Sequence, residues 1–460
     1  MEKYKGIVFI GRIQPPHNSH IELLEHALTR AEKLLVILGS SHASRTVKNP
    51  FTFEERKDML LAALHQYKDR IVVESQRDYF YDESQWSIEV TEKIKKHFNL
   101  NDSLGLMGMY KDHSSYYLNN FPFLEFIPFQ HKFGPKDATE VRECIFEDPY
   151  DTGAKADLER IIGKEVANPS KEVAPLLETI RKNLLDYKVQ DKLQVDLKVT
   201  LKTIDRRAMY STEKILADLI NRWESIEQIL QLQIAEQFLG KELAPRFTDL
   251  FDFFKRKAKS WEDKHSKPTP WARLVPVPVA RYIRENFLET EEYQKLRDEY
   301  DHIKKYKKQW SKSPYPPSFI TSDFVLKCGG NILLVKRKLG MGKDLLALPG
   351  GFVRHLETMR QAAIRELKEE TRLELTPEEL DLIIRDSKVF DYPTRSLRGR
   401  TVTNAFFGKL PIKESLPRVE GADDAAEAFW MPVYDVYQNS DKFFEDHFHI
   451  IHYFLTQEDK

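Results

Sequence analysis

The chain has 460 residues, too many for one ordinary core, so two or three domains are expected. Its net charge of −1 gives no overall field that favours nucleic acid or an anionic membrane surface. No apolar stretch approaches the ~20 residues of a membrane helix, and no basic-then-apolar leader precedes the first apolar run. The two cysteines, Cys144 and Cys328, lie far apart. We therefore expect a cytoplasmic protein without a disulfide framework or a zinc site.

The first third alternates short apolar runs with a helical pattern. The runs predict strands at 6–10, 34–38, 71–73 and 104–109, and a helix is predicted at 20–32. Strands that alternate with helices in this way form a parallel sheet with helices on both faces.

The pattern changes near residue 148. A charged, helix-like stretch follows, with apolar positions at steps of three and four over 210–239. A second helical stretch at 279–310 leads to a proline-rich entry into the last domain, where strands at 319–326 and 331–336 and a helix at 357–371 are predicted. The predicted divisions of the chain are 1–148, 149–273, 274–312 and 313–460.

The first candidate site follows the strand at 6–10, in the run from Gly11 to His20. Gly11 allows a sharp turn that brings backbone amides close to a ligand. The N-terminus of the next helix favours phosphate, and His17 and His20 lie there, where they would donate hydrogen bonds to phosphate oxygens. Ligands bind open α/β sheets at this carboxyl edge. The alternative is a plain turn followed by an ordinary helix histidine.

This run resembles the HxGH signature of nucleotidyltransferases, in the GRxQPxHxGH form of archaeal-type nicotinamide-mononucleotide adenylyltransferases, with Ser19 in the place of a glycine. The resemblance implies a Rossmann-like domain that joins ATP and nicotinamide mononucleotide into NAD and pyrophosphate. It also implies ligand-binding positions, which are Gly11, Arg12, Lys48 at the triphosphate, Trp86 on the nicotinamide, and Thr139 with Arg142 from a second signature. Taken singly, Lys48 could be surface charge and Trp86 a core residue.

The second candidate site has a fixed spacing, which reads Gly351, five residues, Glu357, seven residues, then Arg365-Glu366-Leu367-Lys368-Glu369-Glu370. Glu366, Glu369 and Glu370 stand at i, i+3 and i+4, so they project from one helix face. Their like charges repel unless a cation joins them, and carboxylate oxygens select Mg²⁺ or Mn²⁺. That cation would polarise a pyrophosphate and activate water. Arg365 is predicted to pair with Glu357, and a solvated acidic helix is the alternative.

This spacing resembles the Nudix box, GX5EX7REUXEEXGU, with Arg372 in the place of its last glycine. The resemblance implies an α+β Nudix domain, an α/β/α sandwich. The segments 391–401 and 421–432 resemble ADP-ribose pyrophosphatases fused to the adenylyltransferases above, which implies cleavage of ADP-ribose to AMP and ribose 5-phosphate. Implied substrate positions are Gly351, Arg395, Arg398 and Arg400, and Asp423 or Asp424 would lie on a loop facing the metal. A basic surface hairpin is the alternative for the three arginines.

The two resemblances together predict a multi-domain α/β enzyme of NAD biosynthesis or salvage. Two other hypotheses stay open: a Nudix hydrolase with an inactive first domain, suggested by Ser19 and residues 135–138, and a regulator that senses NAD metabolites. The intact glutamates argue against the regulator.

The helical insertion at 149–273 has no counterpart in the resemblance. Oligomerisation or a lid over the first site are its candidate roles. The basic cluster at 255–259 is better interpreted as a solvated helix face than as a nucleic-acid site. We expect no membrane or nucleic-acid partner, and a homo-oligomer stays open.

Overall fold

The computed structural model describes residues 4–108, 120–129, 138–150, 174, 256, 271–411 and 415–458. Most of the predicted insertion lies outside these residues, including the helix at 210–239 and the other residues of the basic cluster around 256. The chain divides into two compact units: Met1–Gln14, His20–Lys132 and Glu289–Lys460 form one, and Pro15–Ser19 and Phe133–Leu288 form the other.

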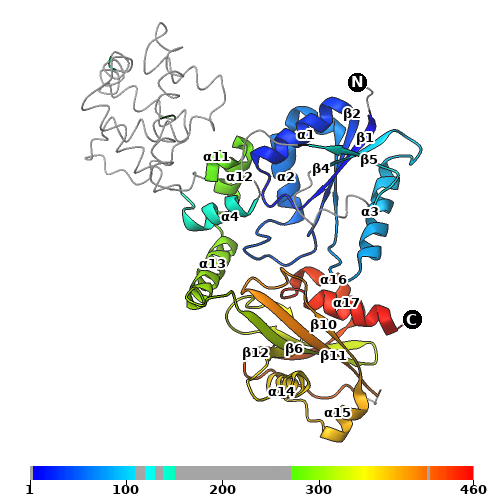
Figure 1. Ribbon diagram of the computed structural model, residues 1–460, viewed down its shortest axis with the longest axis vertical. Helices are drawn as coiled ribbons and strands as arrows, with labels where there is room; N and C mark the ends of the chain where they lie inside the picture. Colours follow the sequence, from blue (N-terminus) through cyan, green and yellow to red (C-terminus); the bar gives the residue numbers. More distant parts are fainter. Residues whose placement is uncertain are drawn as a thin grey trace. The chain divides into compact units, whose positions relative to one another are not determined.

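A five-stranded parallel sheet organises the first domain, in the order β3-β2-β1-β4-β5 (Figure 1). Its strands are β1 (Tyr4–Gly11), β2 (Ala31–Leu38), β3 (Ile71–Ser75), β4 (Leu104–Gly108) and β5 (Glu125–Pro128). The predicted parallel sheet is confirmed. The sequence did not reveal β5, because its four residues, EFIP, are too short for a recognisable period.

Helices cover both faces of this sheet because successive side chains of a strand point to opposite sides. The covering helices are α1 (Asn18–Arg30), α2 (Phe53–Ala63) and α3 (Glu83–His97), and the 3-10 helix η1 (His65–Arg70) precedes β3. Ile7 and Phe9 of β1 pack with apolar residues of α1 and α2. Val8 and Ile10 pack with residues of α3.

A seven-stranded mixed sheet organises the last domain, in the order β10-β11-β6-β7-β12, with β8 paired to β7 and β9 to β6. Its strands are β6 (Ser318–Cys328), β7 (Asn331–Arg337), β8 (Leu346–Ala347), β9 (Gly350–Phe352), β10 (Ile384–Phe390), β11 (Arg400–Leu410) and β12 (Ala425–Pro432). Strands β6 and β11 run parallel, and the other pairs are antiparallel.

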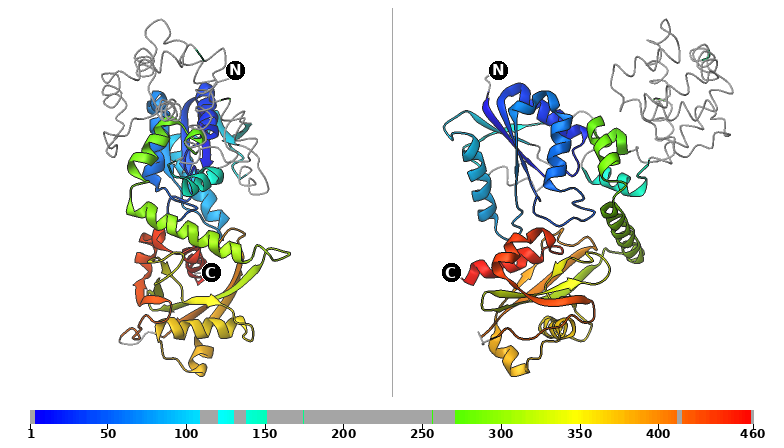
Figure 2. Two further views of the ribbon diagram at one scale, coloured as in Figure 1. Left: turned by 90° about the vertical axis from the view of Figure 1, so that its left-hand side faces the viewer. Right: turned by 180° about the vertical axis from the view of Figure 1, so that it is seen from behind.

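This second sheet lies between two helical layers (Figure 2). Helices α14 (Met359–Thr371) and α15 (Pro377–Ile383) pack on one face, around Phe324 and Leu367. Helices α16 (Val433–Gln438) and α17 (His447–Glu458) cover the other face, and the 3-10 helix η5 (Ser440–Lys442) joins them. The predicted α/β/α sandwich is confirmed.

The chain leaves for the predicted insertion and returns from it at one place. Helix α4 (Ala138–Glu147) precedes the insertion, and α11 (Trp271–Leu274) and α12 (Val277–Asn286) follow it. Trp271 is fully buried, and its indole Nε1 donates to Pro149 O at 2.9 Å. Because this bond joins the two ends of the excursion, α4 and α11 pack as neighbours across a long gap in sequence.

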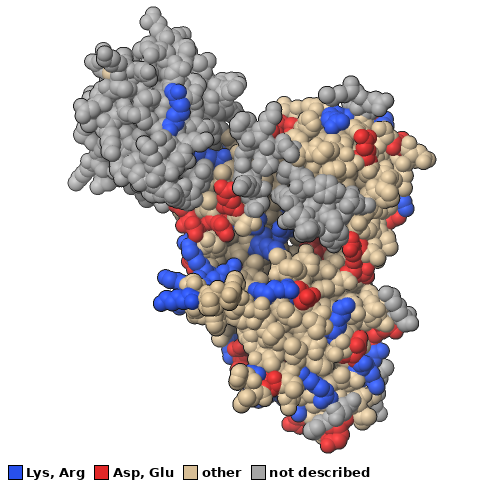
Figure 3. Space-filling model, viewed as in Figure 1, with Lys and Arg blue, Asp and Glu red and all other residues tan. Residues whose placement is uncertain are grey.

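The helical stretch predicted at 279–310 is two helices rather than one. Helix α12 ends at Asn286, and α13 (Glu291–Gln309) begins after Thr290, whose side chain accepts from Tyr293 N. That N-cap explains why a new helix begins there. None of the described helices has the length and apolar character needed to cross a bilayer. On the face drawn in Figure 3, acidic and basic side chains are interspersed over the described part.

Candidate active sites

The loop after β1 is held to the turn before α2 by a buried amide side chain. Gln14 is 1% exposed; its Nε2 donates to Phe51 O at 2.8 Å, and its Oε1 accepts from Phe51 N at 3.1 Å. Thr52 then caps α2 in a capping box with Glu55. Gln14 lies in the run from Gly11 to His20, but nothing in the spacing of that run indicated its partner.

The loops after β2 and β3 are joined in the same way. Asp78 Oδ1 accepts from Ser40 N at 3.1 Å, and Asp78 Oδ2 accepts from Ser40 Oγ at 2.6 Å. The loops that follow β1, β2 and β3 therefore begin at one edge of the sheet, where the carboxyl ends of its strands lie. This is the edge that the sequence predicted for the nucleotide.

The predicted phosphate-binding residues differ in exposure. His17 is 2% exposed and directly precedes α1. His20 lies in the first turn of α1, partly buried, with its ring edge-to-face against Phe9 at 6.4 Å. Arg12 is exposed, in the loop after β1. A Cβ on Gly11 would lie 2.8 Å from the Phe9 ring, so the glycine permits the close packing at the end of the strand.

The other predicted nucleotide contacts have neighbours of their own. Lys48 Nζ donates to Thr394 Oγ1 at 3.1 Å and to Thr394 O at 3.2 Å. Trp86 is partly buried in the first turn of α3, with its ring centroid 5.9 Å from that of Phe121.

In the second unit, Arg142 Nη2 donates to the exposed Thr139 Oγ1 at 3.0 Å. The structure thus brings the two residues of the second signature together. Residues 135–137, which precede these two in the second signature, lie outside the described residues, and the roles of Thr139 and Arg142 stay predictions.

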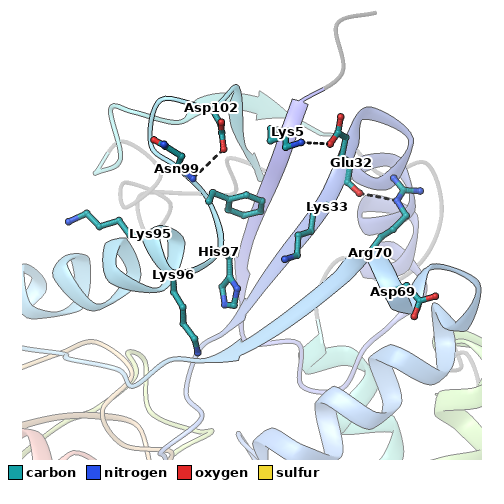
Figure 4. Close-up of a pocket in the computed structure, with 11 residues that line it drawn as sticks. Lys5, Glu32, Lys33, Asp69, Arg70, Lys95, Lys96, His97, Asn99 and Asp102 are labelled. Carbon is teal, nitrogen blue, oxygen red and sulfur yellow. Dashed lines mark hydrogen bonds and ion pairs between the residues drawn. The ribbon is translucent and has the colours of Figure 1, made fainter.

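A polar hollow of about 810 Å³ opens on the first domain, but it is not at this edge (Figure 4). It lies near the amino ends of β1, β2 and β3, which open α/β sheets do not use for ligands. Its charges are largely paired: Lys5 with Glu32 at 2.8 Å, and Lys96 with Glu74 at 2.8 Å. We therefore place no catalytic site there.

In the last domain, α14 carries the acidic residues and begins at a well-made cap. Thr358 and Gln361 form a capping box, which accounts for a start two residues after Glu357. The predicted pair is confirmed: Arg365 Nε donates to Glu357 Oε2 at 3.0 Å, and Nη2 donates to Oε1 at 2.6 Å. The pKa of Glu357 is lowered to about 2, chiefly by this two-point hydrogen bond from the Arg365 guanidinium.

The three glutamates project from one face of α14; two share an arginine partner, and the third accepts from a backbone amide. Glu366 and Glu369 accept from Arg365 Nη1 at 2.6 and 2.9 Å. Glu370 is 7% exposed, and its Oε2 accepts from Gly350 N at 3.1 Å. Burial, followed by the like charge of Glu366, raises the pKa of Glu370 to about 8.

The glycine pair before α14 lies tightly against these carboxylates. A Cβ on Gly351 would lie 2.4 Å from Glu366 Oε1, and a Cβ on Gly350 would lie 2.1 Å from Asp323 Oδ1. Asp323 is buried in β6 and accepts from Thr403 Oγ1 at 2.5 Å. Asp323 belongs to neither sequence motif, although a carboxylate inside an apolar strand is a signal that could have identified it.

These residues fit a divalent cation by their chemistry. Buried carboxylate oxygens beside a glycine backbone are hard donors, and a cation would offset the burial that raises the pKa of Glu370. Among the described residues no three acidic, histidine or cysteine side chains are already grouped as a cage. The reason is visible in Arg365, which holds Glu366 and Glu369 toward itself.

The three predicted substrate arginines have different surroundings. The Arg395 side chain is 2% exposed and forms a two-point ion pair with Asp446, at 2.8 and 2.7 Å. Arg398 lies 5.1 Å from the centroid of the Phe352 ring and 3.4 Å from Glu445 Oε2. Arg400 is partly exposed and donates to Asp391 O.

Asp446 also accepts from Tyr81 Oη at 2.5 Å. The Arg395 guanidinium is therefore buried against a carboxylate, whereas the side chains of Arg398 and Arg400 are more exposed. The substrate role of all three stays a prediction.

The loop with Asp423 and Asp424 lies between β11 and β12, and its backbone is hydrogen-bonded to the end of α14. Ala422 N donates to Glu370 O at 3.1 Å, and both aspartates are exposed. Asp423 adopts the left-handed region, with φ 53°. The backbone bond to Glu370 brings this loop to the C-terminal end of α14, and the role of Asp423 or Asp424 at the metal stays a prediction.

Comparison with known proteins matches one family model in the first domain and another in the last domain. The Cytidylyltransferase-like family matches residues 8–103, and the NUDIX domain family matches residues 321–454. The chain is 34% identical over 148 residues to a nicotinamide/nicotinic acid mononucleotide adenylyltransferase from Acinetobacter baylyi, covering 32% of this chain and 78% of that protein. A nicotinamide-nucleotide adenylyltransferase from Thermococcus kodakarensis is 46% identical over 59 residues, which are 13% of this chain and 31% of that protein.

One solved structure extends the likeness along the whole chain. It is a bifunctional NMN adenylyltransferase/ADP ribose pyrophosphatase from Francisella tularensis, complexed with AMP and a manganese ion. The match covers 99% of both chains at 28% identity, with a TM-score of 0.67.

Proposed function

Because this chain belongs to the nicotinamide/nicotinic acid mononucleotide adenylyltransferase family, we propose that it is a bifunctional enzyme of NAD metabolism. Its first domain transfers the adenylyl group of ATP to nicotinamide mononucleotide, which yields NAD and pyrophosphate. Its last domain hydrolyses ADP-ribose to AMP and ribose 5-phosphate. The observation that carries this proposal is the likeness along both whole chains to the Francisella tularensis enzyme, which joins the same two activities.

The first reaction is an in-line displacement at phosphorus. A 5′-phosphate oxygen of the mononucleotide forms a bond to the α-phosphorus of ATP, while the bond from that phosphorus to the bridging oxygen of pyrophosphate breaks. Little acid–base chemistry is required, so the protein contributes position and charge. His17, His20 and the N-terminus of α1 would stabilise the phosphate charge, and Lys48 would hold the triphosphate after it exchanges Thr394 for the ligand.

The second reaction needs a divalent cation, which polarises the pyrophosphate and activates water when bound. Glu366, Glu369 and Glu370 would hold it, and we propose Mg²⁺ as the resident ion. Gly350 N keeps the Glu370 carboxylate oriented at 3.1 Å. Arg365 Nη1 donates to both Glu366 and Glu369, and these carboxylates would exchange those hydrogen bonds for a bound cation. Arg398 would bind the substrate, since its guanidinium lies beside the aromatic ring of Phe352.

The test supplies both sets of substrates to one purified protein. Nicotinamide mononucleotide with ATP, and in parallel the nicotinic acid form, are incubated with Mg²⁺ or Mn²⁺, and NAD, its acid analogue and pyrophosphate are followed by mass. ADP-ribose is supplied separately, and AMP is measured. His17→Ala should abolish dinucleotide formation and spare AMP release, whereas Glu370→Gln should do the reverse.

Each variant is thus the folded control for the other reaction. If wild-type protein releases AMP but forms no dinucleotide, the first half of the proposal is wrong and the first domain is inactive. If it binds ADP-ribose without releasing AMP at any metal concentration, the last domain is a sensor instead.

A further inference from the structure

Arg56 of α2 is a buried cation between two of the loops at the carboxyl edge of the first sheet. The residue has no exposed surface. Its Nη1 donates to Arg12 O and, at 2.8 Å, to Gly39 O, and its Nη2 donates to Ser41 Oγ at 3.2 Å. One guanidinium therefore joins the loop after β1 to the loop after β2.

The two carbonyls that Arg56 holds share an unusual property. Arg12 precedes Ile13, which has φ 47°, and Gly39 precedes Ser40, which has φ 51°. Positive φ is uncommon for any side chain other than glycine, and for a β-branched residue such as Ile13 it is an outlier. Such backbone is kept only where the surroundings hold it in place, which is what the Arg56 hydrogen bonds do.

These bonds also decide which way the loop amides point. A peptide group is planar and trans, so a carbonyl that faces Arg56 turns the N–H of the next residue away from it. Ser40 shows the result, since its N–H donates to Asp78 Oδ1 at 3.1 Å on the other side. The corresponding amide in the first loop is that of Ile13, within the run from Gly11 to His20.

The acceptors of the Arg56 guanidinium are carbonyl and hydroxyl oxygens, including Thr52 O at 3.2 Å from Nε, and not carboxylates. Burial lowers the pKa of Arg56 to about 10, so the side chain keeps its charge at neutral pH. A buried positive charge beside both loops favours an anion there more strongly than an exposed one would.

We propose that Arg56 is a positioning residue for the triphosphate of ATP: it holds the loops after β1 and β2 in their strained form and adds a buried positive charge. This inference rests on the adenylyltransferase function proposed above. It concerns the binding of ATP rather than the chemical step itself, because the carbonyl contacts of Arg56 set the shape of the loops and not the reacting atoms.

Arg70 provides a matched control in the same domain. Its Nε donates to Glu32 O at 3.0 Å, and its Nη2 donates to Leu28 O at 2.6 Å and Ala31 O at 2.5 Å. It too holds the backbone through its guanidinium, but at the amino ends of the strands, in the hollow of Figure 4. If both arginines were purely structural, replacing either one should change stability and KM for ATP in the same way.

The experiment compares Arg56→Lys, Arg70→Lys and Ser41→Ala with the wild-type full chain. KM for ATP, kcat for dinucleotide formation and the unfolding temperature are measured for each. Lysine has one nitrogen with three N–H groups, whereas the Nε, Nη1 and Nη2 atoms of Arg56 donate to four oxygens. We therefore expect KM for ATP to rise at least ~10-fold in Arg56→Lys, since loop misplacement of about 1 Å carries losses of this order or more. Arg70→Lys should keep KM for ATP within about twofold of the wild-type value. It should lower the unfolding temperature, because it loses hydrogen bonds that stabilise the fold.

Separate values of KM and kcat distinguish a positioning role from a purely structural one. Partial unfolding lowers the amount of active enzyme and hence the apparent kcat, but not KM. Ser41→Ala removes one hydrogen bond to Arg56 and keeps the guanidinium, so it stays informative if Arg56→Lys fails to fold, and it should raise KM by about threefold.

An unchanged KM in Arg56→Lys overturns the inference. If Arg56→Lys does not fold, an unchanged KM in Ser41→Ala overturns it. An equal rise of KM in Arg70→Lys overturns it as well. A wild-type chain that forms no dinucleotide would instead refute the function on which the inference rests.

Discussion

Gly351→Ala should separate the hydrolase site from the stability of its domain. The new Cβ would lie 2.4 Å from Glu366 Oε1, about 1 Å inside ordinary van der Waals contact. The atom in the way is the end of a flexible side chain, so it moves at little cost in folding free energy. Displacing a metal-binding carboxylate by about 1 Å costs on the order of 10²-fold in rate. We expect hydrolysis of ADP-ribose to fall by that factor, with an unfolding temperature near that of the wild type.

The assay measures AMP release across a titration with Mn²⁺, because displacing the Glu366 carboxylate should also lower the affinity for the metal ion. Gly330→Ala is the matched control: it is a glycine of the same domain whose Cβ would meet nothing within 4 Å. Formation of dinucleotide by the first domain serves as the internal standard. Hydrolysis within threefold of the wild type at low Mn²⁺ would refute the reasoning, since Glu366 would then not need its present position.

Three further outcomes follow from single contacts. Burial lowers the pKa of His447 from 6.5 to about 3, and its Nδ1 accepts from Leu348 N at 2.8 Å. The folded state therefore binds fewer protons than the unfolded state at acid pH. Between pH 7.5 and pH 5 the wild type should lose about 2 kcal/mol of unfolding free energy, measured by urea titration, and His447→Asn should not show this loss. Arg372 ends α14 at φ 51°, so Arg372→Gly should raise the unfolding free energy by about 1 kcal/mol, and an unchanged midpoint would contradict this. Gln14→Leu leaves Phe51 N and O without their buried partner and should cost about 3 kcal/mol, and a loss below about 1 kcal/mol would show that the loop relaxes.

Both chemical motifs could be found from the sequence because their chemistry depends on neighbours in the chain. Glu366, Glu369 and Glu370 share a face simply because they belong to one helix, and the Arg365–Glu357 pair follows from the turn that precedes it. The run from Gly11 to His20 likewise joins a strand to a helix, and this order alone places it at the carboxyl edge. The α/β pattern and the two families were therefore accessible before any tertiary structure.

The partners that complete each site were accessible only in three dimensions. Arg56 and Gly39 belong to different elements, and so do Gln14 and Phe51, Asp323 and Thr403, and Arg395 and Asp446. Nothing in residue spacing marks such pairs, because strand order and helix packing bring them together. Arg395 shows the consequence, since its sequence suggests an exposed ligand-binding arginine while the fold buries it against Asp446. Local spacing thus determined which chemistry this protein carries, whereas packing decided which side chains are buried, which are already paired, and which remain exposed to a substrate.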